Sequence, residues 1–521
     1  MNNHVANYWI LIPILLSGIT GIGLLLSSLC EHIKRSRQIV NGNAPENHVA
    51  DEQTDKQRFV LHVLVGTVLV ISVISALTVA WTGERSLTLF YLMDEIPIFF
   101  QIDAVGRLFL TVTSVIWVAV CFYAFVYMKH EGEEKRFFGF FLLLYSVLVS
   151  LDFAGNLITF YFFYELMTLT SMPLVLHNGS KEAIMAALKY LFYSMLGAYC
   201  ALFGIYFLYQ NCDTLTFTAG GTLNLAMAAE SGGILLVAVC VMLIGFGAKA
   251  GMFPLHAWLS TAHPVAPAPA SAALSSIIVK SGVLAIIRSV FYIVGPDFIR
   301  GTWVQNLWIF LTLLTVFMGS MLAYREKIFK KRLAYSTVSQ VSYILFGLSL
   351  LNETAMTGSL LHFVFHAVIK CSLFLTAGIF IFRTGKTKVD EYAGIGKQMN
   401  ITLWCYTFAS LALIGIPPTS GFISKWYLAQ GALQSDTGIF RIAGPIVLLI
   451  SALLTAGYLL PITMKGFLPG KECSVENWEV KREKIDKMVL TLLVLAILAV
   501  VFGILPNPLI QYAGDIAASV M

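Results

Sequence analysis

Charged residues are scarce in this sequence. Of its 521 residues only 12% are charged, whereas 58% are hydrophobic. Soluble domains carry about 25% charged residues, so this composition excludes an ordinary soluble protein. The sequence also has no glycine-rich dinucleotide motif, no Walker loop and no serine–histidine–aspartate context. We therefore expect a polytopic membrane protein without an active site of its own.

Metal-binding motifs are absent as well. The eight cysteines are scattered, mostly within apolar runs, and form no CxxC pair or Cys/His cluster. Free cysteines are often buried packing residues. We expect no metal ion and no cofactor. The basic residues are spread over several loops, which argues against nucleic acid as a partner.

Long apolar runs account for most of the chain. A transmembrane helix needs about 20 apolar residues to cross roughly 30 Å of hydrocarbon, and about fourteen runs approach that length. The expected fold is all-α. Its spans should lie near residues 8–29, 59–81, 108–128, 137–153, 157–176, 183–209, 234–258, 271–294, 303–323, 333–351, 356–382, 402–432, 441–464 and 488–505.

Basic residues mark one side of the membrane, because they cluster in alternate loops. The loop after the ninth span holds Arg325, Lys327, Lys330, Lys331 and Arg332. By the positive-inside rule these loops face the cytoplasm, so both termini should lie on the opposite side. The polar segment 31–58 is predicted to be a flexible or partly ordered cytoplasmic loop.

The segment 245–282 places lysines and histidines inside apolar sequence. A charge at the bilayer centre costs about 2.5–3.5 kcal/mol on insertion scales, so it needs a polar cavity or a partner. Lys249 follows an apolar run, and Pro254 should break the helix just beyond it, leaving carbonyls unpaired. Lys280 lies well inside the next run. A lysine at a helix break indicates an ion pathway.

A second predicted helix break, similar to the one near Lys249, occurs later in the chain. Lys425 follows a second Gly/Pro-rich interruption that contains Pro417 and Pro418. Two interrupted spans in corresponding positions are typical of inverted-repeat transporters. We therefore divide the chain into residues 1–136 (three helices and the loop 31–58), 137–294 (first repeat), 295–464 (second repeat) and 465–521 (a cytoplasmic loop and the last helix).

Glu165 is the one carboxylate in the fifth predicted span. One interpretation is a structural acid that links helices. The other is an ion pair with Lys249, since opposite charges within about 4–6 Å favour the charged forms of both groups. Loosening of such a pair would release a proton, so the pair would act as a switch.

A titratable stripe lies in the eleventh predicted span. His362, His366 and Lys370 are spaced at i, i+4 and i+8, which places them on one face of one helix. Imidazole accepts and donates protons near neutral pH, so the stripe predicts a proton relay. The alternative is that the histidines are hydrogen-bonded core residues, and His362 is the one nearest the helix end.

Further polar residues have two interpretations each. His256 and His263 flank the first break and either relay protons or cap the broken backbone. Lys189 is either structural or part of the relay. Lys425 either carries protons or extends to the cytoplasmic interface. Gln340 does not titrate but could hold a water molecule.

The chain resembles the antiporter-like proton-translocating membrane subunits. This family includes the L, M and N subunits of complex I, the A and D subunits of Mrp Na+/H+ antiporters, and the ion-pumping subunits of membrane-bound hydrogenases. The matching segments cover about residues 137–467. They read FFYELM, AKAGMFPLHAWLSTAHPVAPAPASAALSSIIVKSG, KKRLAYSTVSQVSY, FHAVIKCSLFLTAG and GIPPTSGFISKW.

The resemblance implies fourteen transmembrane helices in two inverted five-helix repeats, each with one broken helix. It also implies a horizontal, water-filled axis of buried charges. A pair like Glu165–Lys249 would lie in the first half-channel, and a group like Lys425 would face the second. The residues that would bridge the centre are Lys280, His366 and Lys370.

Two departures refine the resemblance. Gln340 stands where the family often has histidine, so water must serve there or the position is bypassed. Lys425 stands where the M-type protein has glutamate, and the sequence predicts no long lateral helix of the L-type. The chain is therefore most similar to an Mrp D-type, an N-like or a hydrogenase-associated protein. Its expected location is a prokaryotic cytoplasmic (inner) membrane.

These features predict a subunit that translocates protons, alone or in exchange for Na+, and works with other membrane subunits in the lipid bilayer. An alternative is an ion-pumping or mainly structural membrane subunit of a redox complex. A stand-alone transporter for an organic solute is a third interpretation. It fits less well, because the buried polar groups are almost all titratable, whereas a solute site needs other polar and aromatic contacts.

Overall fold

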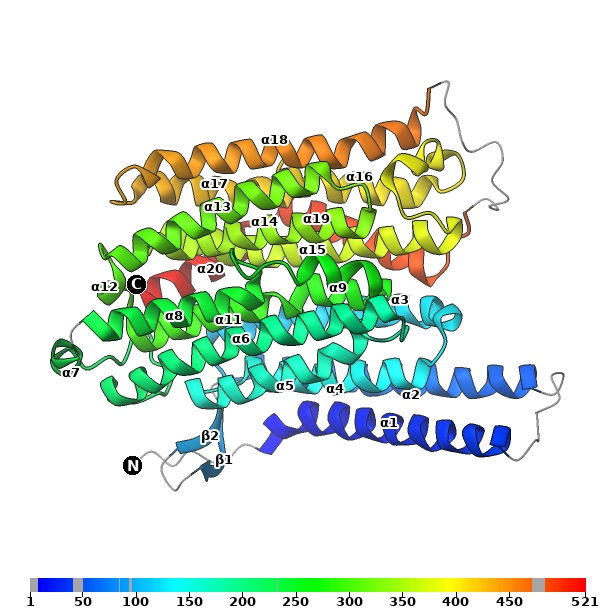
Figure 1. Cartoon of the computed structure of the whole chain (residues 1–521), viewed down its shortest axis with the longest axis horizontal. Coiled ribbons are helices and arrows are strands. Elements are labelled where there is room, and N and C mark those ends of the chain that lie inside the picture. Colours follow the sequence, from blue (N-terminus) through cyan, green and yellow to red (C-terminus); the bar gives the residue numbers. More distant parts are fainter. Residues whose placement is uncertain (1–7, 41–49, 84, 93–95, 232, 471–482) are drawn as a thin grey trace. The chain divides into compact units, whose positions relative to one another are not determined.

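The computed structural model describes residues 8–40, 50–83, 85–92, 96–231, 233–470 and 483–521 (Figure 1). The chain divides into two compact units, Met1–His177 and Asn178–Met521. Cys473 and the rest of segment 471–482, which fall in the predicted loop after the thirteenth span, lie outside the described residues.

The first unit is built from five long helices and a β-hairpin. Its elements are η1 (Tyr8–Ile10), α1 (Leu11–Val40), α2 (Ala50–Trp81), β1 (Ser86–Leu92), β2 (Ile96–Gln101), α3 (Ala104–Glu131), α4 (Glu134–Asp152) and α5 (Leu157–Val175). Helix α4 is central, because it contacts α1, α2, α3 and α5. A β-carbon added at Gly21 would lie 2.8 Å from the carbonyl oxygen of Gly139, so α1 and α4 approach closely.

The segment 31–58, predicted as a flexible or partly ordered cytoplasmic loop, is helical in its described residues. Helix α1 continues to Val40 and α2 begins at Ala50; residues 41–49 lie outside the described residues. An apolar run marks the hydrocarbon-spanning part of a helix. The helix itself can extend further, since lysine, arginine, glutamate and glutamine are also good helix formers.

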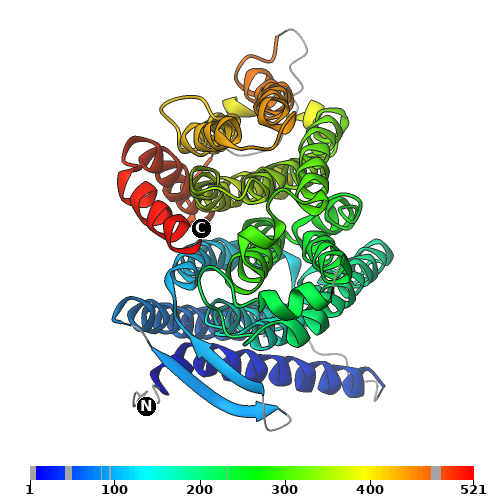
Figure 2. The ribbon, with the colours of Figure 1, turned by 90° about the vertical axis from the view of Figure 1, so that its left-hand side faces the viewer.

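The hairpin β1–β2 was not predicted. Its antiparallel strands pair from Ser86 with Gln101 to Leu92 with Ile96, and Figure 2 shows them as two arrows in the first unit. Strand β2 also contacts α5: the Phe99 N–H donates to Thr159 Oγ1 at 3.0 Å. The two strands were not recognised in the sequence because their residues are as apolar as those of the predicted transmembrane spans.

In the described part of the second unit, the regular secondary-structure elements are all helices. Its elements are α6 (Lys181–Asn211), α7 (Leu225–Glu230), α8 (Gly233–Ala250), α9 (Leu259–Val265), α10 (Ala268–Ala273), η2 (Leu274–Ile278), α11 (Lys280–Ser289), η3 (Val290–Val294), α12 (Pro296–Ile299), α13 (Trp303–Arg325), α14 (Phe329–Ser349), α15 (Glu353–Thr384), η4 (Val389–Tyr392), η5 (Ile395–Lys397), α16 (Asn400–Ile414), α17 (Ser420–Gln434), α18 (Phe440–Phe467), α19 (Lys487–Ile504) and α20 (Asn507–Val520).

Two spans form the interior of this unit. The span Ala268–Val294, which contains two π-helical turns, is fully buried, and α15 is nearly so. Helix α15 contacts α10, α14, α16, α17, α19 and α20. Polar side chains on these two spans are therefore enclosed by protein rather than lipid.

Both expected helix interruptions are present. Helix α8 ends at Ala250, and residues 251–258, which include Pro254, are not in a regular helix. Helix α16 ends at Ile414, and α17 begins at Ser420 after a segment that contains Pro417 and Pro418. The freed backbone groups can be satisfied only inside protein, which fits their position within the unit.

The all-α polytopic membrane fold is confirmed, but the number fourteen stays a prediction. Eleven helices of the described residues are long and apolar enough to cross a membrane. The predicted spans 137–153, 333–351 and 402–432 correspond to α4, α14 and the α16–α17 pair, which are outside those eleven. Helix α20, absent from our prediction, packs against α15.

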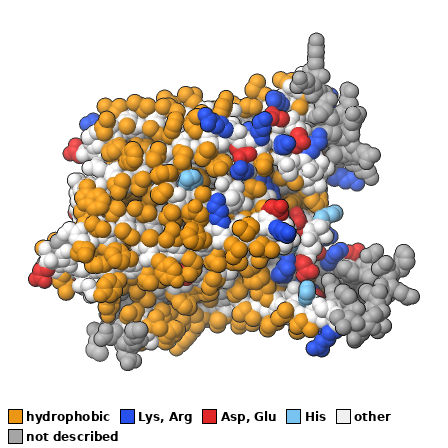
Figure 3. Space-filling model, in the orientation of Figure 1, with side chains coloured by type: hydrophobic (Ala, Val, Ile, Leu, Met, Phe, Trp, Pro, Cys, Tyr) orange, Lys and Arg blue, Asp and Glu red, His pale blue; other side chains and the backbone are white. Residues whose placement is uncertain are grey.

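The surface of the second unit agrees with this topology. In Figure 3 hydrophobic side chains cover the flanks of α6, α8, α13 and α18, and charged side chains gather where α13 and α18 end. At that end the segment before α14 pairs with the segment before η4, since Phe329 N–H donates to the Thr387 carbonyl at 2.9 Å. The basic residues of two predicted cytoplasmic loops therefore lie together.

Candidate functional site

Lys249 lies in the last turn of α8 and is buried. Its Nζ atom donates to the hydroxyl oxygens of Tyr190 (2.7 Å) and Ser194 (3.2 Å) on α6. The same atom lies 4.5 Å from the centre of the Tyr190 ring. Residues four apart on a helix are neighbours, so Tyr190 and Ser194 form one polar cradle for the ammonium group.

The first helix break is supported by side chains around it. The Trp258 indole N–H donates to the carbonyl of Ala248 at 3.0 Å, which caps the end of α8. The Phe253 N–H donates to Thr315 Oγ1 on α13 at 3.0 Å. These bonds satisfy backbone groups that the break frees, so Lys249 does not serve as the cap for Ala248.

Lys280 lies immediately after the π-helical turn η2 and is buried. A π turn shifts the backbone hydrogen bonds by one residue. The Lys280 ammonium donates to the carbonyl oxygen of Ser275 within that turn. The side chain of Ser275 makes a second contact, because its hydroxyl lies 2.8 Å from the Thr337 hydroxyl of α14 and the two form a hydrogen bond. Lys280 is thus connected to the neighbouring helix through polar groups.

The predicted stripe on α15 is fully enclosed. His362, His366 and Lys370 are at most 2% exposed. The two imidazole rings are nearly parallel, with centroids 5.8 Å apart. The Lys370 ammonium donates to the carbonyl oxygen of Leu333 on α14 at 3.0 Å. As expected, His362 is the one of the three nearest an end of α15, which begins at Glu353, but its side chain is buried like those of the other two.

Lys425 lies in the second turn of α17, just after the second break. Its ammonium donates to the carbonyls of Leu413 (2.7 Å) and Ile414 (2.8 Å), the last residues of α16. It also lies 5.2 Å from the centre of the Tyr343 ring. These contacts direct the half-buried side chain toward the end of α16, and its role in carrying protons stays a prediction.

Three of these lysines share one kind of partner. Lys280, Lys370 and Lys425 donate to main-chain carbonyl oxygens, and no carboxylate of the described residues lies within ion-pair distance of them. A carbonyl solvates an ammonium group but does not neutralise its charge. The charged and neutral forms of such a lysine are therefore closer in free energy than in a buried ion pair.

Several further predicted residues are buried polar groups. His263 and Gln340 are fully buried, and none of their ring or amide atoms has a hydrogen-bond partner among the described residues. The same is true of both ring nitrogens of His366. The His263 ring stacks on Phe374 with centroids 4.6 Å apart. Buried polar groups without a protein partner are typically hydrated, so this region can hold water.

The remaining secondary residues lie further out. His256 and Lys189 are only partly buried, and His256 stacks on Phe253 with ring centroids 6.0 Å apart. Glu165 is half-buried on α5 of the first unit, while Lys249 belongs to the second. The pairing of Glu165 with Lys249 stays a prediction.

Sequence reasoning missed several polar residues. Tyr190 directly follows Lys189, and Ser194 lies one turn beyond Tyr190, but hydroxyl side chains are too common in membrane helices to stand out. Lys330 was assigned to a loop, yet it is buried in the first turn of α14 and donates to the carbonyl of Ala266 at 2.9 Å. Arg288 on α11 is also buried, 4.7 Å from the centre of the Phe217 ring.

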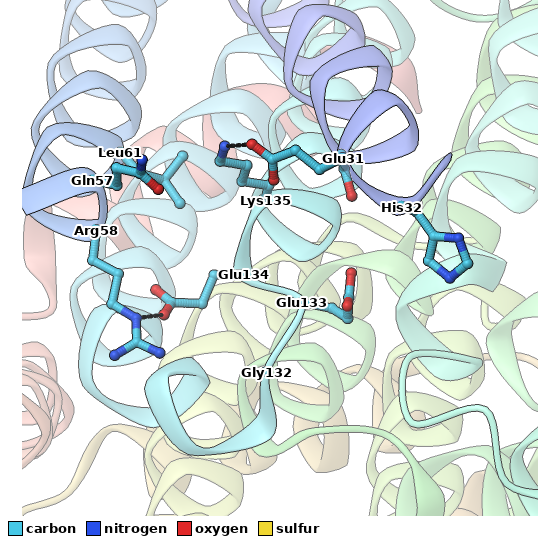
Figure 4. A pocket seen from close by; sticks show the side chains of 10 residues that line it. Glu31, His32, Gln57, Arg58, Leu61, Gly132, Glu133, Glu134 and Lys135 are labelled. Carbon is cyan, nitrogen blue, oxygen red and sulfur yellow. Dashed lines mark hydrogen bonds and ion pairs between the residues drawn. The ribbon is translucent and has the colours of Figure 1, made fainter. Parts of the chain in front are cut away.

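A polar cavity of about 160 Å³ lies in the first unit at the ends of α1 and α2 (Figure 4). Four of the charged side chains that line it form two ion pairs, Lys135 with Glu31 and Arg58 Nε with Glu134 at 3.0 Å. These pairs join α1 and α2 to α4 and leave no obvious ligand chemistry. No group of three His, Cys, Asp or Glu side chains suited to a metal ion occurs in the described part of the chain.

Comparison with known proteins identifies the family of this chain. The family model described as "NADH:quinone oxidoreductase/Mrp antiporter, TM" matches residues 154–454. The N subunit of the NADH-quinone oxidoreductase of Desulforudis audaxviator is 31% identical over 372 residues, 71% of this chain and 72% of that protein. The D-type protein of the Na(+)/H(+) antiporter of Alkalihalophilus pseudofirmus is 28% identical over 471 residues, 89% of this chain and 92% of that protein.

Solved structures share the fold. A chain of the Mrp complex from Dietzia sp. aligns with a TM-score of 0.76 at 22% identity, covering 98% of this chain and 97% of that one. A chain of respiratory complex I from Thermus thermophilus aligns with a TM-score of 0.77 at 21% identity, covering 98% and 100%. The predicted resemblance is confirmed: this chain belongs to the NADH:quinone oxidoreductase/Mrp antiporter family of membrane proteins.

Proposed function

We propose that this chain is a proton-translocating integral-membrane subunit of a multisubunit complex. The observation that carries the proposal is a series of lysines whose ammonium groups are held by main-chain carbonyls: Lys280 and Lys370, which are buried, and Lys425, which is half-buried. A buried lysine without a carboxylate partner can give up its proton at a moderate cost. Such groups can pass protons through a region where a fixed ion pair could not.

The series follows helices that pack against one another. Helix α8 contacts α11, η2 contacts α15, and α15 contacts α17. His366, His263 and Gln340 lie among them with polar atoms that have no partner in the described structure. Water bound to these atoms would connect the lysines, because each water molecule can accept and donate hydrogen bonds. Lys249 begins the series and Lys425 ends it.

The identity of the complex belongs to the proposal as well. The names of the relatives include a component of a Na(+)/H(+) antiporter and a component of a quinone oxidoreductase. We propose partner subunits within a prokaryotic cytoplasmic membrane, with both termini on the extracytoplasmic side. The carried ion is H+, with Na+ as the exchanged ion if the parent complex is an antiporter. A redox parent complex would instead drive the same groups by electron transfer in other chains.

Transport by the assembled complex tests the function. Lys370→Met should abolish proton movement measured by a pH-sensitive dye in everted membrane vesicles. Lys388→Met, on the exposed segment before η4, is the matched control and should transport normally. Intact transport in the Lys370→Met complex would refute the proposed pathway.

Copurification in mild detergent tests the parent complex. Small hydrophobic membrane proteins alone would identify an antiporter. Partners that carry flavin, nickel or iron–sulfur clusters would identify a redox complex, and the antiporter assignment would then be wrong.

A double-mutant cycle tests the Glu165–Lys249 pair. Residues in direct contact show interaction energies of about 0.5–3 kcal/mol. Glu165→Gln and Lys249→Gln should therefore be non-additive in transport and in stability. Additive effects would show that the two side chains act independently.

A further inference from the structure

A hydrogen bond joins the histidine stripe to the helix that follows the second break. His362 Nδ1 on α15 lies 2.9 Å from Ser424 Oγ on α17. Both side chains are buried, and α15 and α17 pack along one another. Ser424 directly precedes Lys425. The contact thus lies where the predicted relay meets the predicted end of the pathway.

The proton count at Ser424 assigns the donor of this bond. The Ser424 hydroxyl lies 3.2 Å from the carbonyl oxygen of Gly421, with the geometry of a donor. A carbonyl can only accept, and a hydroxyl has a single hydrogen to give. When the hydroxyl hydrogen points to the Gly421 carbonyl, the bond to His362 runs from Nδ1–H to Ser424 Oγ. His362 is the Nδ1–H tautomer in this arrangement.

The rest of the His362 ring is held by stacking. Its centroid lies 5.5 Å from that of Tyr343 on one side and 5.8 Å from that of His366, and both pairs are within 19° of parallel. Its Nε2 atom has no hydrogen-bond partner within the described residues. In the Nδ1–H tautomer this nitrogen carries the lone pair. The ring can neither flip nor tilt freely while both stacks and the hydrogen bond persist.

We infer that Ser424 is a positioning residue that fixes His362 as the Nδ1–H tautomer and leaves Nε2 as its single proton-accepting atom. This inference rests on the proposed function, because it assigns a role within the same pathway. While the bond lasts, His362 takes up and returns a proton through the same nitrogen. Passage through the ring to the other nitrogen requires the bond to Ser424 to open.

Because Ser424 lies on α17, the bond between Ser424 and His362 depends on the position of that helix. Helix α17 begins at Ser420, immediately after the Pro417–Pro418 segment, so Ser424 is in its second turn. A displacement of α17 away from α15 would lengthen the 2.9 Å bond and release Nδ1. The state of the second break and the direction of proton transfer at His362 are thereby linked.

Nitrogen NMR of the assembled complex tests the tautomer directly. The solid-state spectrum of 15N-histidine-labelled complex minus that of the His362→Gln complex isolates the His362 signals. We expect the Nδ1–H tautomer in the native chain and a shift toward the Nε2–H tautomer in Ser424→Ala. An Nε2–H signal in the native chain, or an unchanged signal in Ser424→Ala, would overturn the inference.

Transport distinguishes positioning from simple packing. Orienting partners of functional histidines at metal sites contribute about 10–100-fold, so Ser424→Ala should lower transport roughly tenfold and Ser424→Thr should restore it. Ser420→Ala removes an equally buried hydroxyl one turn earlier and should leave transport unchanged. Equal losses in Ser424→Ala and Ser420→Ala would reduce Ser424 to a packing residue.

A separate outcome would show that the proposed proton pathway is wrong while the inference about Ser424 holds. If His362→Gln transports normally while the native spectrum shows the Nδ1–H tautomer, the hydrogen bond exists but His362 carries no protons. That result would reject the role of His362 in the proposed function and leave the Ser424 geometry intact.

Discussion

The ammonium group of Lys425 lies 2.8 Å from the carbonyl oxygen of Ile414, the last residue of α16. A second bond of 2.7 Å reaches the carbonyl of Leu413. The last carbonyls of a helix have no partner within the helix, and a lysine can satisfy them. Lys425 therefore joins the two halves of the interrupted span in addition to its predicted role in proton transfer.

Substitution of Lys425 separates these two roles. Lys425→Met should lose both, with a decrease in the free energy of unfolding of about 1–3 kcal/mol because two buried carbonyls lose their donor. Lys425→Arg should retain most of the stability but lose transport, since arginine does not release its proton. Thermal unfolding in detergent and vesicle transport measure the two effects. A transporting Lys425→Arg complex would exclude proton release from this position.

Tyr190 should support Lys249 through its hydroxyl. Tyr190→Phe keeps the ring under the ammonium group but removes the 2.7 Å bond, and hydrogen bonds to charged groups are worth about 1.5–3 kcal/mol. We expect lower stability by that amount and slower transport. Tyr199→Phe, an exposed residue of the same helix, provides the comparison. Equal behaviour of the two variants would show that the Tyr190 hydroxyl does not contribute.

The close approach of α6 and α8 should not tolerate a side chain. A β-carbon at Gly197 would lie 2.6 Å from the Gly245 carbonyl oxygen, and one at Gly245 would lie 2.8 Å from the Ala201 nitrogen. Gly245→Ala should therefore lower the free energy of unfolding by about 1–3 kcal/mol through overpacking. Gly233→Ala, at the open start of α8, meets no atom within 4 Å and should be tolerated. A stable Gly245→Ala protein would indicate that the helices can separate without cost.

His177 should make the stability of the first unit depend on pH. Burial, together with the nearby Arg136 guanidinium, lowers the pKa of His177 to about 4 from an ordinary value of 6.5. Between these values the unfolded chain binds more protons than the folded one, so stability rises with pH across this window and levels off above it. A shift of this size corresponds to roughly 3 kcal/mol.

Denaturation of the His177→Gln variant measures this contribution. The variant should show a flatter stability profile between pH 4 and 6.5 than the native chain. His32→Gln, which removes an exposed histidine of the same unit, should keep the native profile. A native-like slope in His177→Gln would assign the pH dependence to other groups.

The site residues that could be predicted from the sequence are ionisable residues within apolar segments, where burial of a charge is unfavourable. Lys249, Lys280, His366 and Lys370 stood out because ionisable groups are rare in apolar spans, and the structure places them inside the protein. Pro254 identified the first interruption for an equally direct reason, because proline cannot complete a helical hydrogen-bond ladder. These features depend on local chemistry that a single sequence displays.

Features set by tertiary contacts were not predictable. Lys330 looked like one more loop lysine, because nothing in the neighbouring sequence shows that it bonds to the carbonyl of Ala266, the residue that follows α9. The Ser424–His362 bond joins residues 62 positions apart, so no local pattern reveals it. The hairpin of Ser86–Leu92 and Ile96–Gln101 was missed because its apolar strands resemble short pieces of membrane helix.

The two π-helical turns affect how relatives should be aligned. A π turn accommodates one more residue than an α-turn in the same length, and one residue corresponds to about 100° of rotation. The turns Leu274–Ile278 and Val290–Val294 therefore each offset the helix faces on their two sides, with Lys280 between them. A homologue with an ordinary α-turn at either place will be one residue shorter there. The gap belongs inside that turn, because a gap placed elsewhere would match the Lys280 position with a residue that faces another direction.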